Sequence, residues 1–278
     1  MLAIGLMSGT CLDGIDVSLI RTDGESQLEL IANYHQPYEK EFQIELKKFL
    51  NSAYNWSIIE RKLTVKHAQA IATLLDQVKP CEKVEIIGFH GQTIIHKPEI
   101  GFTWQMGDPN LLAKLVKIDV IGDFRRRDMA YGGQGAPLVP VYHRALINQL
   151  EKPVLVINIG GVSNFTYIGP NEDELIAFDV GPGNALIDDL CLELFGKQYD
   201  YDGNIASNGL VDRQLVEDLL RDEYFARPPP KSLDRNHFSS HVTRLNNLNH
   251  VDKIATISYF TVASILKSIE LHLPDNGG

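Results

Sequence analysis

The residues with the clearest chemical potential lie in a turn near the N-terminus, within the stretch GLMSGTCLDGIDVSLI from Gly5 to Ile20. Gly9 and Gly14 allow a close approach to phosphate oxygens, and exposed N–H groups at such a turn form an anion-binding nest. Asp13 and Asp16 supply carboxylates that can hold Mg²⁺, directly or through water. The turn fits a magnesium–phosphate site, although a tight hairpin that tolerates polar residues explains the same spacing equally well.

Two familiar phosphate motifs are excluded at this turn. No Gly-Lys-Ser/Thr follows it, so it is not a Walker loop, and a strand-like run rather than a helix follows it, so it is not a dinucleotide fingerprint. The stretch NIGGVSN, from Asn158 to Asn164, offers the same chemistry a second time. Two such turns in corresponding positions are a stronger signal than one, because hairpins that face each other across a cleft can grip a polyphosphate from both sides.

Three consecutive arginines, Arg125, Arg126 and Arg127, stand out in an acidic chain. A run of like charges is usually a solvated face. This run lies between an expected strand and a glycine-rich loop, and an arginine fork pairs with a carboxylate in bidentate fashion. We therefore expect at least one of the three to hold an anionic substrate.

Asp179 lies at an expected strand end and precedes Gly181-Pro182-Gly183. Open α/β folds place their chemistry at the carboxyl ends of strands, beside helix starts. Helix capping is the simpler role for such a carboxylate, but Asn184 can supply the cap, which leaves Asp179 for other work. His90 and His96 suggest a metal, yet no third ligand is near them in the sequence, and histidines with satisfied hydrogen bonds are the favoured interpretation.

Hydrophobic periodicity predicts the elements that must position these residues. Strands are expected at residues 2–7, 15–19, 84–89, 93–95, 119–121, 154–158 and 163–168, with one more ending at Val180; helices are expected at 39–50, 59–78, 109–116 and 253–273, with one more starting near Asn184. Residues 122–140, rich in Gly, Pro and Arg, are expected to form a functional loop at a domain boundary. The repeated unit of strand, glycine turn and strand predicts a duplicated α/β architecture with a cleft between residues 1–136 and residues 137–278.

Composition restricts the class of protein. The 278 residues include 26 Lys and Arg against 36 Asp and Glu, a net charge of -10, so we expect no nucleic-acid partner. No stretch reaches 18 unbroken apolar residues, so no membrane span is expected. The N-terminus shows no signal-peptide pattern, and Cys11, Cys81 and Cys191 have no metal-type spacing. These features favour a cytoplasmic protein with reduced thiols.

Taken together, the motifs resemble those of anhydro-N-acetylmuramic acid kinases, which belong to the sugar kinase/Hsp70/actin superfamily. The matching stretches run in family order from residue 5 to residue 238: GLMSGTCLDGID, GFHGQTIIHKP, WQMGDPNLLA, GDFRRRDMAYGGQGAPLVP, NIGGVSNFTYI, FDVGPGNALIDD and PPPKSLDRNHF. The resemblance implies two RNase H-like α/β domains around a central cleft, the actin-like ATPase fold. It also implies an ATP-dependent kinase of peptidoglycan recycling. That reaction opens the 1,6-anhydro ring of the sugar with water and phosphorylates O6, giving N-acetylmuramic acid 6-phosphate and ADP.

The resemblance also implies roles for individual residues. Asp179 matches the catalytic base, and Asp13 and Asp16 would hold Mg²⁺. ATP contacts are implied at Gly9, Thr10, Cys11, Leu12, Asp13, Gly14, Ile15 and Asp16 in the first turn and at Asn158, Gly160 and Gly161 in the second. Sugar contacts are implied at His90, Arg127, Gln134 and Asn184, with the lactyl carboxylate of the sugar as the partner of Arg127. A homodimer is left open.

The chain departs from the family pattern at two places. Family members usually have Ser at the position of Cys11, and a thiol is a weaker hydrogen-bond donor. The family also continues past the helix matching residues 253–273 into a strand and a GGG motif that borders the adenine pocket, which implies a second domain truncated at the C-terminus. Two alternatives therefore stand beside the kinase: a truncated, catalytically weak remnant that binds sugar or nucleotide, and a related small-molecule kinase or phosphatase.

Overall fold

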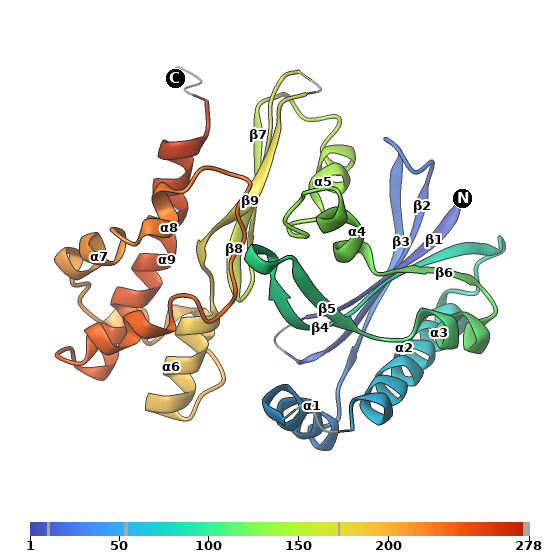
Figure 1. Cartoon of the computed structure of the whole chain (residues 1–278), viewed down its shortest axis with the longest axis horizontal. Helices are drawn as coiled ribbons and strands as arrows, with labels where there is room; N and C mark the ends of the chain where they lie inside the picture. The colour runs from blue at the N-terminus through green and yellow to red at the C-terminus, as the bar shows by residue number, and fades with distance from the viewer. Residues whose placement is uncertain (10–11, 53–54, 172, 275–278) are drawn as a thin grey trace. The chain divides into compact units, whose positions relative to one another are not determined.

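The computed structural model describes residues 1–9, 12–52, 55–171 and 173–274. The chain divides into two compact units, residues 1–148 and residues 149–278, and each combines one sheet with helices (Figure 1). The expected α/β class is therefore confirmed.

Unit 1, residues 1–148, is built on a six-stranded mixed sheet in the order β3-β2-β1-β4-β5, with β6 also paired to β4. Its strands are β1 (Leu2–Ser8), β2 (Gly14–Thr22), β3 (Leu28–Pro37), β4 (Val84–Lys97), β5 (Phe102–Met106) and β6 (Asp119–Gly122). β1 and β2 form an antiparallel hairpin, and β1 and β6 both run parallel to β4. The predicted N-terminal hairpin is thus confirmed, with its turn at one end of the central strand β1.

The helices of unit 1 pack by their apolar faces. They are α1 (Lys40–Ser52), α2 (Trp56–Val78), η1 (Pro98–Ile100), α3 (Pro109–Val116), α4 (Phe124–Ala130) and α5 (Pro140–Leu146). In α2, Leu63, Ala70, Ile71 and Leu74 recur with helical spacing and are buried, and the helix contacts β2, β3 and α3. α3 begins at a strong signal, since the Asp108 carboxylate accepts the N–H groups of Asn110 and Leu111.

Two expectations about unit 1 are corrected by the structure. Residues 84–97 form one strand rather than two, because Gly91 at φ 73° carries the chain through the HGQ stretch, where a Cβ would lie 2.5 Å from the Met106 carbonyl oxygen. Residues 122–140 are not wholly a loop, because they include the helix α4. The run FRRRDMA has ordinary helix propensity, which the surrounding glycines and prolines concealed.

Unit 2, residues 149–278, holds a three-stranded antiparallel sheet in the order β7-β8-β9. Its elements are β7 (Val154–Ile159), β8 (Val162–Ile168), β9 (Leu175–Pro182), α6 (Ala185–Phe195), η2 (Tyr201–Gly203), η3 (Ala206–Asn208), α7 (Arg213–Leu219), α8 (Glu223–Ala226), η4 (Ser239–Leu245) and α9 (His250–His272). The second predicted hairpin, β7–β8, is confirmed. In Figure 1, α9 runs alongside the sheet, and it contacts β8 and β9.

The helix α9 forms the core of unit 2. Ile254, Ile257 and Phe260 on this helix are fully buried, and the Asn249 side chain caps its N-terminus. By length and composition alone, α9 is the one helix in the described residues apolar enough to cross a membrane, and half of its most apolar window is buried inside the structure. A core helix passes the same test, and α9 packs as one.

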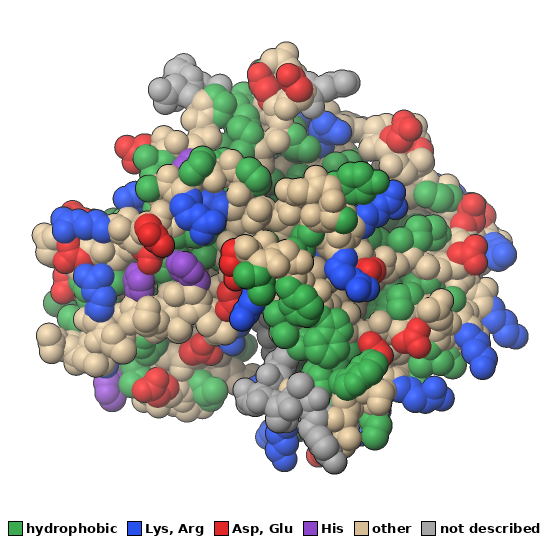
Figure 2. All heavy atoms as spheres, in the orientation of Figure 1, with side chains coloured by type: hydrophobic (Ala, Val, Ile, Leu, Met, Phe, Trp, Pro, Cys, Tyr) green, Lys and Arg blue, Asp and Glu red, His purple; other side chains and the backbone are tan. Residues whose placement is uncertain are grey.

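Charged groups are mixed over the surface. On the face drawn in Figure 2, acidic and basic side chains are interspersed. Despite the net charge of -10, acidic side chains do not form one continuous patch on this face.

Candidate active site

The first glycine turn closes the β1–β2 hairpin, in which Met7 pairs with Asp16. Leu12 adopts φ 57°, buries its side chain and donates its N–H to the Gly9 carbonyl at 3.2 Å. A Cβ at Gly14 would lie 2.4 Å from the Gln36 carbonyl oxygen, so this position requires glycine. Ile15 is fully buried, so only its backbone can reach a ligand. Thr10 and Cys11 lie outside the described residues.

A side chain of β4 and a backbone N–H that follows β3 support this turn. Gln92, fully buried on β4, donates from Nε2 to the Gly9 carbonyl at 3.1 Å, and the Tyr38 N–H donates to the Asp13 carbonyl at 2.9 Å. Ser8 lies opposite Gln92 in the parallel β1–β4 register. Ser8 Oγ and Gln92 Oε1 are buried without a hydrogen-bond partner in the part of the chain that the structure describes. Such atoms are free to bond a ligand or a water.

The two carboxylates of the turn are exposed. Asp13 Oδ1 accepts the Gly14 N–H at 3.1 Å, and Asp16 Oδ1 lies 2.8 Å from His35 Nδ1. Across residues 1–9, 12–52, 55–171 and 173–274, no group of three or more His, Cys, Asp or Glu side chains is arranged to hold a metal ion. Two exposed carboxylates suit a hydrated Mg²⁺, which keeps most of its waters, better than a metal enclosed by protein ligands.

The second glycine turn is held by backbone contacts. In β7–β8, Asn158 pairs with Asn164, and the Gly160 N–H donates to the Val162 carbonyl at 3.2 Å. The Gly160 carbonyl accepts the Asn184 N–H at 2.7 Å, and the Gly161 carbonyl accepts the N–H groups of residues 183 and 185 at 3.1 and 3.2 Å. The Gly161 N–H itself has no acceptor among the described residues. One N–H is therefore available to a phosphate at a turn whose carbonyl groups bond the start of α6.

Gly183 and Asn184 join this turn to α6. A Cβ at Gly183 would lie 2.2 Å from the Gly160 carbonyl oxygen, so the contact requires glycine. The expectation that the Asn184 side chain caps α6 is wrong: it makes no capping bond, and its Nδ2 donates to the Ile159 carbonyl at 3.1 Å. The Asn184 backbone has helical angles, φ -83° and ψ -14°, instead of the extended angles of a residue whose side chain caps a helix.

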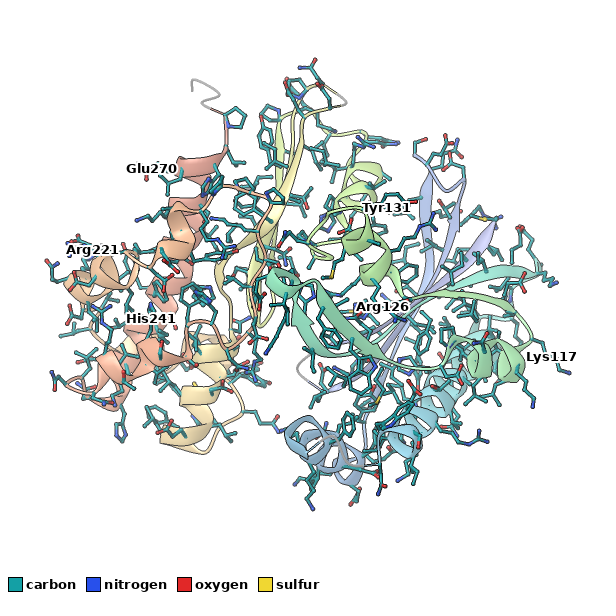
Figure 3. All side chains as sticks on the ribbon, viewed as in Figure 1. Lys117, Arg126, Tyr131, Arg221, His241 and Glu270 are labelled. Atoms are coloured by element: carbon teal, nitrogen blue, oxygen red, sulfur yellow. The ribbon has the colours of Figure 1, made fainter. Side chains whose placement is uncertain are left out.

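The three arginines lie on α4 and have different surroundings; Figure 3 labels Arg126 on this helix. Arg125 donates from Nε to His90 Nε2 at 3.0 Å and from a guanidinium nitrogen to the Gly135 carbonyl at 3.3 Å. Arg126 pairs with Asp123 at 2.6 Å. Arg127 is exposed and makes no hydrogen bond or ion pair within the described residues. Of the three, Arg127 is therefore the one whose guanidinium is available to an anion.

His90 is a neutral histidine engaged at both ring nitrogens. Burial, together with the Arg125 charge, lowers its pKa to about 4. Because Nε2 accepts from Arg125, Nδ1 carries the proton and donates to the Gly91 carbonyl at 2.8 Å. His96 is likewise hydrogen-bonded, through Nδ1 to Thr103 Oγ1 at 3.0 Å.

Gln134 lies in a turn folded onto the end of α4. The Asp128 carboxylate accepts the Gly135 N–H at 2.7 Å, and the Asp128 carbonyl accepts the Gly133 N–H at 3.0 Å. A Cβ at Gly133 would lie 2.1 Å from the Asp128 carboxylate. These contacts fix the backbone on both sides of Gln134, whose side chain is half-buried.

Asp179 is buried on β9, with 6% of its surface exposed. Its Oδ2 accepts the Leu233 N–H at 2.8 Å, and its own N–H donates to the Lys231 carbonyl at 3.2 Å. The Tyr224 hydroxyl donates to the Asp179 carbonyl at 2.5 Å. A carboxylate oriented by a backbone N–H is suited to general-base chemistry, which requires a fixed acceptor within reach of the proton.

Sequence reasoning did not single out Tyr224, Lys231 or Leu233. The signals for this segment were the proline run before Lys231, which predicts an extended backbone, and the family resemblance of the whole stretch PPPKSLDRNHF, which assigned no role to its individual residues. That extended segment bonds Asp179, which lies far from it in the sequence, and local sequence patterns cannot predict such a contact.

Comparisons with known proteins show which family the chain resembles. The profile of the family described as anhydro-N-acetylmuramic acid kinase matches residues 1–277. The protein of that name from Rhizorhabdus wittichii is 44% identical over 284 residues, which cover 99% of this chain and 77% of the relative. Its counterpart from Paramagnetospirillum magneticum is 46% identical over 267 residues, covering 95% and 75%. Among solved structures, a glucokinase from Balamuthia mandrillaris in complex with glucose aligns at 14% identity over 96% of this chain and 75% of its own, with a TM-score of 0.29 that supports no conclusion about the fold.

Proposed function

The chain belongs to the anhydro-N-acetylmuramic acid kinase family, and we propose that its glycine turns bind ATP and that Asp179 is the base of the reaction. The chain is a phosphotransferase of amino-sugar metabolism. It uses ATP to convert 1,6-anhydro-N-acetylmuramic acid into N-acetylmuramic acid 6-phosphate and ADP, a step of peptidoglycan recycling. We place this reaction in the cytoplasm, where ATP is found.

Asp179 carries the proposal, because its carboxylate is buried and held by the Leu233 N–H. It accepts a proton from the water that attacks the anomeric carbon of the sugar. The new bond joins the water oxygen to this carbon, and the bond from the carbon to O6 breaks. O6 then attacks the γ-phosphorus, and ADP leaves. Ring opening therefore generates the nucleophile for phosphoryl transfer at the point where it is used.

The polar groups left open at both turns support ATP binding. Ser8 Oγ, Gln92 Oε1 and the Gly161 N–H have no hydrogen-bond partner in the described residues. The Ser8 hydroxyl and the Gly161 N–H can donate to a phosphate, and the Gln92 amide oxygen can accept from a bridging water. The backbone of residues 9–16 and that of Asn158 to Gly161 would lie along the phosphates. Asp13 and Asp16 would hold Mg²⁺ through water, and the ion would neutralise charge on the transferring phosphate.

The sugar contacts are proposed at Arg127, His90, Gln134 and Asn184. The free guanidinium of Arg127 suits the lactyl carboxylate of the substrate, because a fork of N–H donors matches the two oxygens. His90 offers the sugar a ring edge whose nitrogens are already bonded, so its contribution is to hold Arg125 and to shape the wall of the site.

We further propose that the units are a pair of RNase H-like domains of the actin-like ATPase type. Both begin with three consecutive antiparallel strands, β1-β2-β3 and β7-β8-β9. In unit 1 a parallel strand, β4, follows on the free side of β1. The same side of β7 has no partner among the described residues.

An acceptor screen tests the proposed function. The purified protein is incubated with ATP and Mg²⁺, and with the anhydro sugar, the ring-opened sugar or acetate in turn. ADP release is expected with the anhydro sugar, along with a product heavier by one water and one phosphoryl group. Release of ADP with acetate instead would assign the chain to another branch of the superfamily.

A further inference from the structure

We propose that Lys231 is a positioning residue, which fixes the segment bearing the Leu233 N–H against the carboxylate of Asp179. This inference rests on the proposed role of Asp179 as the base. Lys231 has 1% of its surface exposed, and neither substrate can reach its ammonium group directly. Its influence must therefore pass through the residues that it holds.

The Lys231 side chain anchors its segment to α8. Its Nζ donates to the carbonyl oxygens of Tyr224 and Phe225 at 3.1 and 3.2 Å. Both carbonyls belong to the short helix α8, which ends at Ala226, and carbonyls of the last helical turn favour a cation. The ammonium also lies over two aromatic rings, 4.7 Å from the centroid of Tyr224 and 5.2 Å from that of Phe178.

The same residues close a ring of contacts around Asp179. The Lys231 carbonyl accepts the Asp179 N–H, and the Tyr224 hydroxyl donates to the Asp179 carbonyl. Two residues after Lys231, the Leu233 N–H donates to Asp179 Oδ2. The Lys231 ammonium, which is bound to α8, therefore fixes the position of both the backbone and the carboxylate of Asp179.

The charge at this anchor is costly to bury. No carboxylate pairs with Lys231 within the described residues. Burial and the nearby Arg227 charge lower its pKa to about 8. From α9, His272 Nε2 lies 3.1 Å from Nζ and 2.9 Å from the Phe225 carbonyl oxygen, so it either accepts from the ammonium or donates to the carbonyl. An apolar side chain would fill the space without this cost, which argues that the fixed polar contacts serve the neighbouring carboxylate.

Loss of the anchor has a distinct signature. If the segment loosens, the Leu233 N–H no longer holds the Asp179 carboxylate, and a carboxylate that has lost one hydrogen-bond donor is protonated more easily. The acidic limb of the profile of kcat against pH should then move to higher pH. A displacement on the order of 1 Å at a reacting group lowers kcat by roughly 10²-fold, and KM for the sugar should stay nearly constant.

The test compares Lys231→Met with Lys267→Met in the full 278-residue protein, using ATP and the anhydro sugar. Lys267 is a matched control, since its Nζ donates to the Leu220 carbonyl at 2.9 Å in the same unit without contacting Asp179. Lys231→Met is expected to lower kcat by roughly 10- to 100-fold and to shift the acidic limb upward. Lys267→Met is expected to alter the melting temperature alone. A folded Lys231→Met protein with the wild-type kcat and pH profile would overturn the proposal.

Tyr224→Phe decides the matter if Lys231→Met does not fold. This variant removes only the hydroxyl bonded to the Asp179 carbonyl, and it should shift the same limb in the same direction by a smaller amount. An unshifted limb in folded Tyr224→Phe would then overturn the proposal. Asp179→Asn distinguishes the role of Asp179 as the base from the role of Lys231 as a positioning residue. If the Asp179→Asn variant retains wild-type turnover, the assignment of the base fails. If it is inactive while the Lys231 and Tyr224 variants behave as wild type, only the positioning role fails.

Discussion

The two glycine turns share a sequence pattern but are supported in different ways. The first is held by side chains that reach it from other elements, such as Gln92 bonded to the Gly9 carbonyl. The second is held mainly by backbone hydrogen bonds to the first residues of α6, with one side-chain bond from Asn184 to the Ile159 carbonyl and with Gly183 making the close approach possible. Similar strand–turn–strand sequences therefore do not imply similar mechanical support.

This difference has consequences for ligand binding. The first turn keeps unbonded side-chain oxygens, Ser8 Oγ and Gln92 Oε1, and two exposed carboxylates. In the described residues, the second turn keeps one open N–H group, that of Gly161. A phosphate at the second turn would meet a preset backbone N–H group, whereas at the first turn it would meet the Ser8 hydroxyl and the carboxylates proposed to hold Mg²⁺.

Acid should weaken the support of the first turn most. His90 lies on β4 with Gln92, and the ring of His67 packs edge-on against Phe89 of the same strand at 4.9 Å. Burial lowers the pKa of both histidines from 6.5 to about 4. As the pH falls, the histidines of the unfolded chain take up protons before those of the folded chain. The contribution of the two neutral histidines to the free energy of unfolding is therefore fully present above about pH 6.5. It is lost as the pH falls toward 4, by about 3 kcal/mol per histidine.

Urea unfolding at about pH 7 and about pH 4 measures this loss. His67→Phe should remove roughly half of it, while replacement of the exposed His250 in unit 2 should leave it unchanged. An identical loss in wild type and His67→Phe would show that the buried histidines are not its source.

Arg127→Ala should weaken sugar binding without affecting either glycine turn. A lost charge-assisted contact costs about 1.5–3 kcal/mol, so the affinity for the anhydro sugar should fall by tenfold or more. ATP affinity should be nearly constant. Arg126→Ala is the matched control, because Arg126 already pairs with Asp123. Calorimetric titration with equal sugar affinities for the two variants would remove Arg127 from the site.

Gly183→Ala should damage the second turn alone. The added Cβ meets a backbone oxygen at 2.2 Å, which cannot move aside without shifting the hairpin from α6. The expected loss is about 1–3 kcal/mol of unfolding free energy. Gly5→Ala is the control in β1, where a Cβ meets nothing within 4 Å. Equal melting curves for both variants would mean that the second turn is as adaptable as the first.

Gln92→Leu should produce the smallest effect, at the first turn. It removes one hydrogen bond to the Gly9 carbonyl, worth about 1 kcal/mol, so ATP affinity should fall about fivefold. Gln105→Leu, on β5, is the control, because the Gln105 amide bonds Thr103 rather than the turn. Unchanged ATP binding in Gln92→Leu would place the nucleotide away from the first turn.

Local patterns in the sequence predicted the parts of the fold that local forces determine. Apolar runs located β1 and β7, alternation located β2, the glycine turn after β7 located the return strand β8, and helical spacing located α2 and α9. The strands β3 and β5 were missed, because both lie at or near the edge of the sheet and expose many of their side chains, such as Leu30 and Phe102. Partly exposed strands lack the apolar alternation on which the prediction depends.

The candidate site was predictable by residue type but not by contact. Glycines, carboxylates and arginines identified the turns, Asp179 and α4. The bonds from Arg125 to His90 and from Leu233 to Asp179 join residues 35 and 54 positions apart, which no periodicity can reveal. The same holds for Asn184, whose side chain bonds the distant Ile159 instead of its own helix.

The most direct test of the account is the coupling of ring opening to phosphorylation in Asp179→Asn. With saturating ATP and anhydro sugar, ADP release and formation of the ring-opened sugar are followed together, and sugar affinity is measured by calorimetry. Both rates are expected to fall in parallel by roughly 10²- to 10⁴-fold while sugar binding is retained. Phosphorylation of O6 at a near-normal rate by this variant would contradict the assignment of Asp179 as the base.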